Sequence, residues 1–146
     1  MLTTPHAAAG IAIGAFVGNP LVVIPTTMAS HFLLDAVPHW QETLAPYNPT
    51  RKTYIRVPLD IALAVAMTIL ATRWQPHYTG VIWLGAIFAN VPDLDTVTIL
   101  IPKLRQGIVR KYYDWHCAIQ RETASLWGVV PQLLVIAISL VLVKVR

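Results

Sequence analysis

Charged side chains are scarce in this chain. Asp, Glu, Lys and Arg make up 12% of its 146 residues, whereas hydrophobic residues make up 55%. A water-soluble domain usually carries about 25% charged residues, so little of this surface is suited to water. Composition and length therefore predict a single integral membrane domain over residues 1–146. The net charge of +4 fits short basic loops beside membrane lipid, and we expect no nucleic-acid partner.

Cysteine and the common enzyme motifs are also missing. Cys117 is the single cysteine, which excludes an intramolecular disulfide and a CxxC zinc motif. No Gly-x-Ser-x-Gly elbow, P-loop or dinucleotide fingerprint occurs, which argues against the enzyme classes built on them. The first residues, MLTTPHAAAGIAIG, lack the basic region of a cleavable signal, so we expect them to belong to the mature protein.

Apolar segments between polar breaks predict an all-α, polytopic membrane protein with about five transmembrane or re-entrant helices. The expected helices cover residues 6–17, 21–35, 57–72, 80–89 and 125–143. The first, at roughly 18 Å, is short for a hydrocarbon core about 30 Å thick. The first two helices therefore form either a tight pair of thin spans or a re-entrant hairpin, and their alanines and glycines would permit close packing.

Most basic residues fall on one face of this topology. Eight Lys and Arg residues lie on the face with the 39–56 and 101–123 loops, against three on the opposite face. The positive-inside rule then places the first face in the cytoplasm of a multi-pass inner-membrane protein. Of the five histidines, His77 alone falls on the opposite face.

The most informative stretch is residues 30–40, which read SHFLLDAVPHW. His31 and Asp35 lie four residues apart, so a helix presents both on one face, and His39 follows four residues later. Imidazole and carboxylate groups at this spacing bind divalent metals, and ionisable side chains in apolar surroundings usually have a function. The alternative is a hydrogen-bonded pair at a helix end that reaches the membrane interface.

A second polar stretch, NVPDLD at residues 90–95, lies inside an apolar run. A proline and two aspartates there predict a broken helix that lines a cavity. Asp93 then serves as a ligand or general base and Asp95 as an alternative base, although aspartate at a helix N-terminus is also a common cap. His6, His39 and His116 are further candidate ligands, and each could instead be an ordinary histidine of a helix start or loop.

Imidazoles and carboxylates without thiolates favour Zn²⁺, with Mn²⁺ or Fe²⁺ as alternatives. The candidates outnumber one tetrahedral set of ligands, so we expect one or two ions. Such a site activates water for ester or phosphoester hydrolysis, and basic loops beside the membrane favour an amphiphilic, anionic lipid as substrate. Two other functions stay open: a metal or lipid carrier without catalysis, and a scaffold whose His and Asp residues only pair with each other.

Four motifs in chain order resemble those of the membrane-bound metal-dependent hydrolases: TPHAAAGIAIG, SHFLLDAVPHW, NVPDLD and WHCAIQRE. These are small multi-span inner-membrane proteins of bacteria and archaea, some of them associated with LexA regulation. The resemblance implies hydrolase activity and a metal centre at His6, His31, Asp35, His39, Asp93 and His116. The chain departs from the family pattern after His116, where CAIQRETAS lacks the second histidine that relatives often carry.

Overall fold

The computed structural model describes residues 1–41, 50–123 and 126–146, and this part of the chain is helical without a named strand. The predicted all-α class is therefore confirmed. The α-helices are α1 (Thr3–Val17), α2 (Pro20–Asp35), α3 (Thr53–Trp74), α4 (Thr79–Phe88), α5 (Val97–Leu100), α6 (Gly107–Ile119) and α7 (Val130–Val145). Short 3-10 helices join some of them, including η2 (Val91–Thr96) and η4 (Leu126–Gly128).

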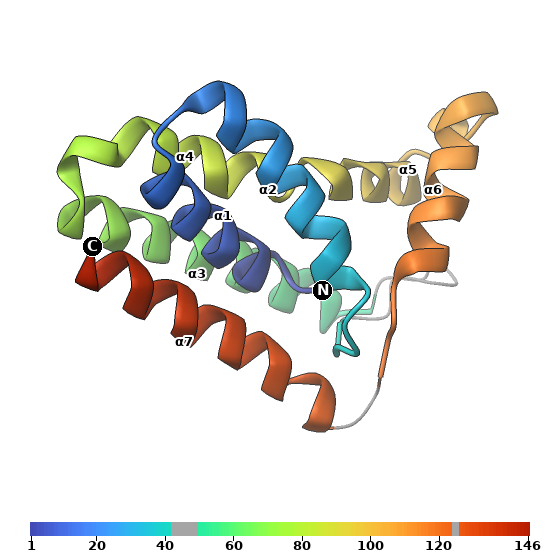
Figure 1. The fold of residues 1–146 in the computed structure, drawn as a ribbon. Helices are drawn as coiled ribbons and strands as arrows, with labels where there is room; N and C mark the ends of the chain where they lie inside the picture. Colours follow the sequence, from blue (N-terminus) through green and yellow to red (C-terminus); the bar gives the residue numbers. More distant parts are fainter. Residues whose placement is uncertain (42–49, 124–125) are drawn as a thin grey trace.

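Helix α1 lies at the centre of the molecule, with α2, α3, α4 and α7 packed around it (Figure 1). At the glycines of α1, its contact with α4 is backbone against backbone. A Cβ atom added at Gly10 would overlap the carbonyl group of Gly85, and one added at Gly85 would overlap that of Gly10. Gly14, one turn further along α1, lies equally close to Val81 of α4. The sequence predicts close packing of small residues between the first two helices, but this backbone contact joins α1 to α4.

Two helical segments are long and apolar enough to span a membrane. They are α3, with 22 residues, and the 20-residue segment Leu126–Val145, which comprises η4 and α7. Only 22% of the most apolar window in each is buried inside the protein, whereas the core helix of a soluble protein would be mostly buried. The apolar faces of these two helices therefore point outward, as lipid-facing helices do. Helices α1 and α2 are shorter, at 15 and 16 residues.

Helix α6 runs across the end of the bundle at which α3 and α7 begin (Figure 1). The sequence treats residues 101–123 as a basic loop, and a helix forms there because the segment is amphipathic. Tyr113 and His116, one turn apart, are buried on its inner face. Arg110 and Asp114 lie 3.6 Å apart on its exposed face. The predicted break after the fourth helix is also found, since α4 ends at Phe88 and the 3-10 helix η2 follows.

Candidate metal centre

Four polar side chains from three separate segments meet in the interior. They are His31 and Asp35 at the end of α2, Asp93 in η2 and His116 in α6. Each offers one ligand atom, and all four atoms lie within 4.8 Å of one another. Asp93 is partly exposed, while the other three side chains are buried. These four residues, called the His/Asp group below, could hold a metal ion.

Three members of the His/Asp group have the spacing of ligands around one ion. The Nε2 atoms of His31 and His116 lie 3.2 Å apart, and Asp35 Oδ2 lies 3.1 Å from the first and 3.2 Å from the second. Tetrahedral ligands about 2.0–2.1 Å from a zinc ion are separated by about 3.3 Å. Asp93 Oδ1 is more distant, at 3.5 Å from His31 Nε2 and 4.0 Å from His116 Nε2. Asp93 is therefore the member of the group whose oxygen lies farthest from the two imidazole nitrogens.

Both imidazoles are held so that Nε2 faces the centre of the group. His31 Nδ1 lies 2.7 Å from the carbonyl oxygen of Ala89, which can only accept a hydrogen bond. His116 Nδ1 lies 2.9 Å from Asp95 Oδ2, a carboxylate acceptor. Each Nδ1 therefore carries a proton, and both rings direct Nε2 at each other and at Asp35. Nitrogen and oxygen atoms this close need a proton or a metal ion between them, and the donor set fits a divalent metal ion.

His6 contacts the His/Asp group from behind. Its Nε2 donates a hydrogen bond of 3.1 Å to Asp35 Oδ1, the oxygen that faces away from the two inner Nε2 atoms. Its ring also stacks on the ring of His31, with centroids 3.9 Å apart. The α-amino nitrogen of Met1 contacts the same Asp35 oxygen. His6, a predicted ligand, is thus placed to orient Asp35 and His31.

His39, also a predicted ligand, is buried outside the His/Asp group. Its Nδ1 donates to the carbonyl oxygen of Val37 at 2.8 Å, and its Nε2 lies 3.4 Å from Gln41 Oε1. Its backbone N–H donates to the Arg121 carbonyl at 3.0 Å, and its own carbonyl accepts from Thr123 N–H at 2.8 Å. His39 therefore joins the segment after α2 to the segment after α6, and the structure does not bring it to the other ligands.

The two remaining aspartates have well-defined contacts. Asp95, a predicted general base, accepts the hydrogen bond from His116 Nδ1 on the far side of that ring. Asp60 of α3 binds the N-terminus of α1. Its carboxylate accepts hydrogen bonds from the N–H groups of Thr3, at 2.7 Å, and Thr4, at 3.2 Å. A carboxylate at that position satisfies free backbone donors and the positive end of the helix dipole.

The charge of the His/Asp group favours a cation. Burial alone would lower the pKa of His116, but its hydrogen bonds to Asp35 and Asp95 outweigh burial and raise the pKa to about 9. In the absence of metal, a proton on His116 Nε2 therefore supplies the positive charge that the carboxylates require. A metal ion bound at the same place would displace that proton.

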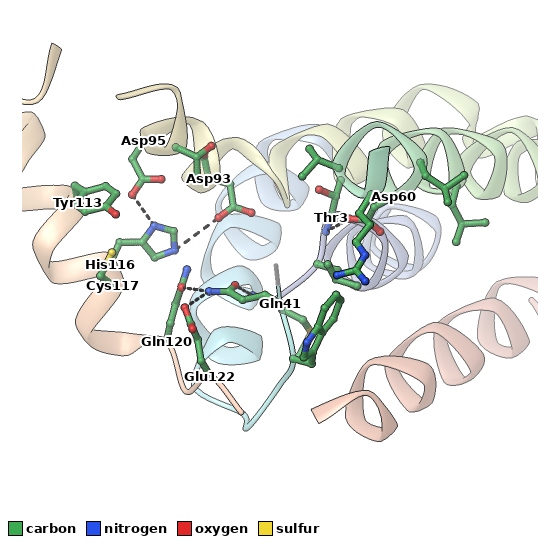
Figure 2. A pocket seen from close by; sticks show the side chains of 18 residues that line it. Thr3, Gln41, Asp60, Asp93, Asp95, Tyr113, His116, Cys117, Gln120 and Glu122 are labelled. Atoms are coloured by element: carbon green, nitrogen blue, oxygen red, sulfur yellow. Dashed lines mark hydrogen bonds and ion pairs between the residues drawn. The ribbon is translucent and has the colours of Figure 1, made fainter. Parts of the chain in front are cut away.

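A cavity of about 540 Å³ opens beside the His/Asp group. Asp93, Asp95 and His116 line one side of it, and Thr3 and Asp60 lie on the other (Figure 2). Between them, Gln41 Nε2 donates to Gln120 Oε1 at 2.8 Å. The cavity therefore gives a ligand from outside access to Asp93 and His116.

Sequence reasoning missed several glutamines around this cavity. Gln132 of α7 is buried, accepts a hydrogen bond from Leu2 N–H at 3.1 Å and donates to the Trp40 carbonyl at 2.7 Å. A glutamine inside an apolar span is the signal that could have identified it, because a polar side chain there needs a partner. Gln41 and Gln120 lie in polar segments and carry no such signal.

Comparisons of the chain with protein-family models, curated proteins and solved structures find no match in any of the three.

Proposed function

We propose that the chain is a membrane-embedded, metal-dependent hydrolase that cleaves an ester or phosphoester bond of a lipid-like substrate. One observation carries the proposal. Two imidazole Nε2 atoms and one carboxylate oxygen converge at ligand spacing beside a cavity that His116 lines. A scaffold that only paired histidines with aspartates would need neither two Nε2 atoms that face each other nor the cavity.

His31, Asp35 and His116 would hold one divalent ion, with Zn²⁺ as the first candidate and Mn²⁺ or Fe²⁺ next. With neutral imidazoles, such an ion would offset the charge of Asp93 and share that of Asp35 with the α-amino group of Met1, so a single ion suffices. When bound, a divalent ion lowers the pKa of a water molecule to near neutrality and polarises a carbonyl or phosphoryl oxygen. Ala89 and Asp95 keep the two rings in the ligating orientation through their Nδ1 hydrogen bonds.

Asp93 is the general base in this proposal. It lines the cavity, it is partly exposed, and it lies farther from both Nε2 atoms than Asp35 does. Its carboxylate would take a proton from the attacking water while the water oxygen bonds to the acyl carbon or phosphorus. The ester C–O or P–O bond then breaks, and Asp93 returns the proton to the departing alkoxide. Asp95, already bound to His116, positions that ring.

The orientation in the membrane is part of the same proposal. We infer that α3 and the Leu126–Val145 segment cross the inner membrane and that α1, α2 and α4 complete a domain of about five membrane helices. The basic helix α6 lies across the end at which both long segments begin, which supports a cytoplasmic location for that end. The motif resemblance to the membrane-bound metal-dependent hydrolases supports the same assignment.

The test is a hydrolysis screen on detergent-purified protein loaded with Zn²⁺ or Mn²⁺, using carboxylester, phosphomonoester and phosphodiester lipids. We expect turnover that disappears on chelation and returns with metal. Asp93→Asn should keep the metal and lose about 100-fold or more in rate, since general base catalysis contributes about that much. Asp114→Asn, on the exposed face of α6, is the matched control.

Full activity after verified metal removal would refute the proposal, as would unchanged turnover in Asp93→Asn. Stoichiometric binding of metal or lipid without any hydrolysis would identify the chain as a carrier instead.

A further inference from the structure

One face of α3 forms a wall of the cavity, and the side chains on this face change from charged to aliphatic along the helix. Arg56, Leu59, Asp60 and Leu63 all line the cavity, and their spacing puts them on a single helical stripe. Arg56 lies in the first turn of α3, and Leu63 lies seven residues later, or about 10 Å along the axis. The wall therefore begins with a cation and continues as aliphatic surface.

The cationic end of this wall is held beside an anchored aromatic ring. The guanidinium carbon of Arg56 lies 5.7 Å from the ring centroid of Trp40, which also lines the cavity. The Trp40 backbone is fixed in turn, since its N–H donates to the Gly128 carbonyl at 2.9 Å and its carbonyl accepts from Gln132. A guanidinium group is planar, and its geometry matches two oxygens of a phosphate group.

The acidic residue on the same stripe is already engaged. Asp60 uses its carboxylate oxygens to accept hydrogen bonds from the backbone N–H groups of Thr3 and Thr4. The positive end of the α1 dipole therefore offsets its charge, and Asp60 is a weak competitor for an anion near Arg56.

The aliphatic end of the wall is continuous with the outside of the molecule. Leu59 and Leu63 line the cavity, yet they are 66% and 56% exposed. Both belong to a helix long and apolar enough to span a membrane. Across the cavity lie Tyr113 and Cys117 of α6. A hydrocarbon chain in the bilayer could therefore enter sideways along α3, without leaving apolar surroundings.

We propose that Arg56 is the phosphate-binding residue of this cavity and that its ligand is a phosphate-bearing lipid whose chain lies along Leu59 and Leu63. The ligand then occupies the same cavity as Asp93 and His116. The claim that this lipid is the substrate rests on the proposed hydrolase function. The claim that the lipid binds at Arg56 can be tested without measuring turnover.

The experiment measures lipid binding to the full-length, metal-loaded protein in phosphatidylcholine nanodiscs. The probes are fluorescent phosphatidic acid and a fluorescent diacylglycerol with the same chains. We expect phosphatidic acid to bind more tightly and Arg56→Gln to weaken it about 10-fold or more, because a charge-assisted hydrogen bond is lost. Arg56→Lys should recover part of the affinity as a point charge. Arg51→Gln removes a nearby exposed arginine that does not line the cavity, and it should leave affinity unchanged.

Competition with inorganic phosphate separates a lipid ligand from free phosphate. If the chain contributes as proposed, inorganic phosphate displaces phosphatidic acid only weakly. Equal affinity for the two, lost in Arg56→Gln, would overturn the lipid assignment. Equal binding of diacylglycerol and phosphatidic acid would overturn the phosphate site, and so would identical affinities in Arg56→Gln and Arg51→Gln.

The two proposals fail in distinguishable ways. Binding of phosphatidic acid that depends on Arg56, without hydrolysis of any lipid, would support this inference and refute the hydrolase. Metal-dependent hydrolysis of lipids, with KM and lipid affinity unchanged in Arg56→Gln, would support the hydrolase and refute the role of Arg56.

Discussion

Two buried regions of this molecule are packed in opposite ways: one is backbone against backbone, and the other is filled by polar side chains. At the contact between α1 and α4, Gly10 and Gly85 leave the two backbones touching with no side chain between them. In the His/Asp group, polar side chains fill the interior and point imidazole nitrogens and carboxylate oxygens at one another. The first region excludes added atoms, whereas the second could hold one more, a metal ion.

The two regions are connected through the end of α4. A Cβ atom at Gly10 would crowd Ala89 as well as Gly85. The carbonyl of Ala89 is the acceptor that keeps the proton on His31 Nδ1. Backbone packing in the first region thus positions a hydrogen bond on which the chemistry of the second depends. The comparison teaches that the small residues of α1 help to place the His/Asp group as well as to pack the fold.

The largest effect should come from removing a ligand of the His/Asp group. His31→Ala or His116→Ala should reduce zinc affinity by more than the roughly 10–100-fold typical of residues that only orient a ligand. Affinity is measured by competition with a chelator of known Kd. His77 is exposed and lies outside the His/Asp group. The control variant His77→Ala should therefore bind zinc as the wild type does. Equal losses in all three variants would contradict the assignment.

Adding one methyl group at the α1–α4 contact should destabilise the protein. Gly10→Ala is expected to lower the free energy of unfolding by about 1–3 kcal/mol, since the backbone of α4 cannot move aside without wider shifts. It should also weaken zinc binding, because Ala89 is displaced. Gly80→Ala is the matched control in α4, where an added Cβ has nothing within 4 Å. Denaturant titrations with and without zinc compare the two, and equal stability would disprove the close contact.

A smaller loss of zinc affinity should follow when Asp95, the hydrogen-bond partner of His116, is changed. Asp95→Asn keeps an oxygen for His116 Nδ1 but removes the negative charge. We expect zinc affinity to fall by about 10–100-fold. The folding midpoint in the absence of metal serves as the check on structure. An affinity equal to that of Asp114→Asn would show that Asp95 does not support His116.

The smallest expected change in stability comes from weakening the contact between Asp60 and the N-terminus of α1. Thr4 contacts Asp60 through its hydroxyl as well as its N–H group. Thr4→Ala should cost about 1 kcal/mol of stability and leave zinc affinity nearly unchanged. Thr72→Ala, whose hydroxyl bonds only within its own helix at Ile69, provides the comparison. If Thr4→Ala instead abolished zinc binding, Asp60 would belong to the metal centre.

Much of the metal centre follows from local spacing. His31 and Asp35 are one turn apart in α2, and the structure places their ligand atoms 3.1 Å apart. Asp93 was identifiable because a proline and acids interrupt an apolar run, and that segment is the 3-10 helix η2. In these cases the helical repeat or the cost of a buried charge acts within a few residues, so sequence is enough.

The remaining features depend on contacts between distant segments. His116 joins the group because the amphipathic helix α6 turns it inward, although a single histidine in a basic segment carries little signal. His39 has the same helical spacing from Asp35 as His31, but α2 ends at Asp35 and the chain turns away. The carbonyl of Ala89 has no side-chain signature at all. Such features are determined by tertiary packing, which the spacing of residues does not encode.

The most direct test of the metal centre is the elemental content of detergent-purified wild-type protein beside Asp35→Ala, with Asp114→Ala as control. The account predicts about one Zn, Mn or Fe ion per chain in the wild type and the control, and none in Asp35→Ala. Wild-type protein that contains no metal, and takes up none after reconstitution with each ion, would contradict it and leave the His/Asp group as a set of structural pairs.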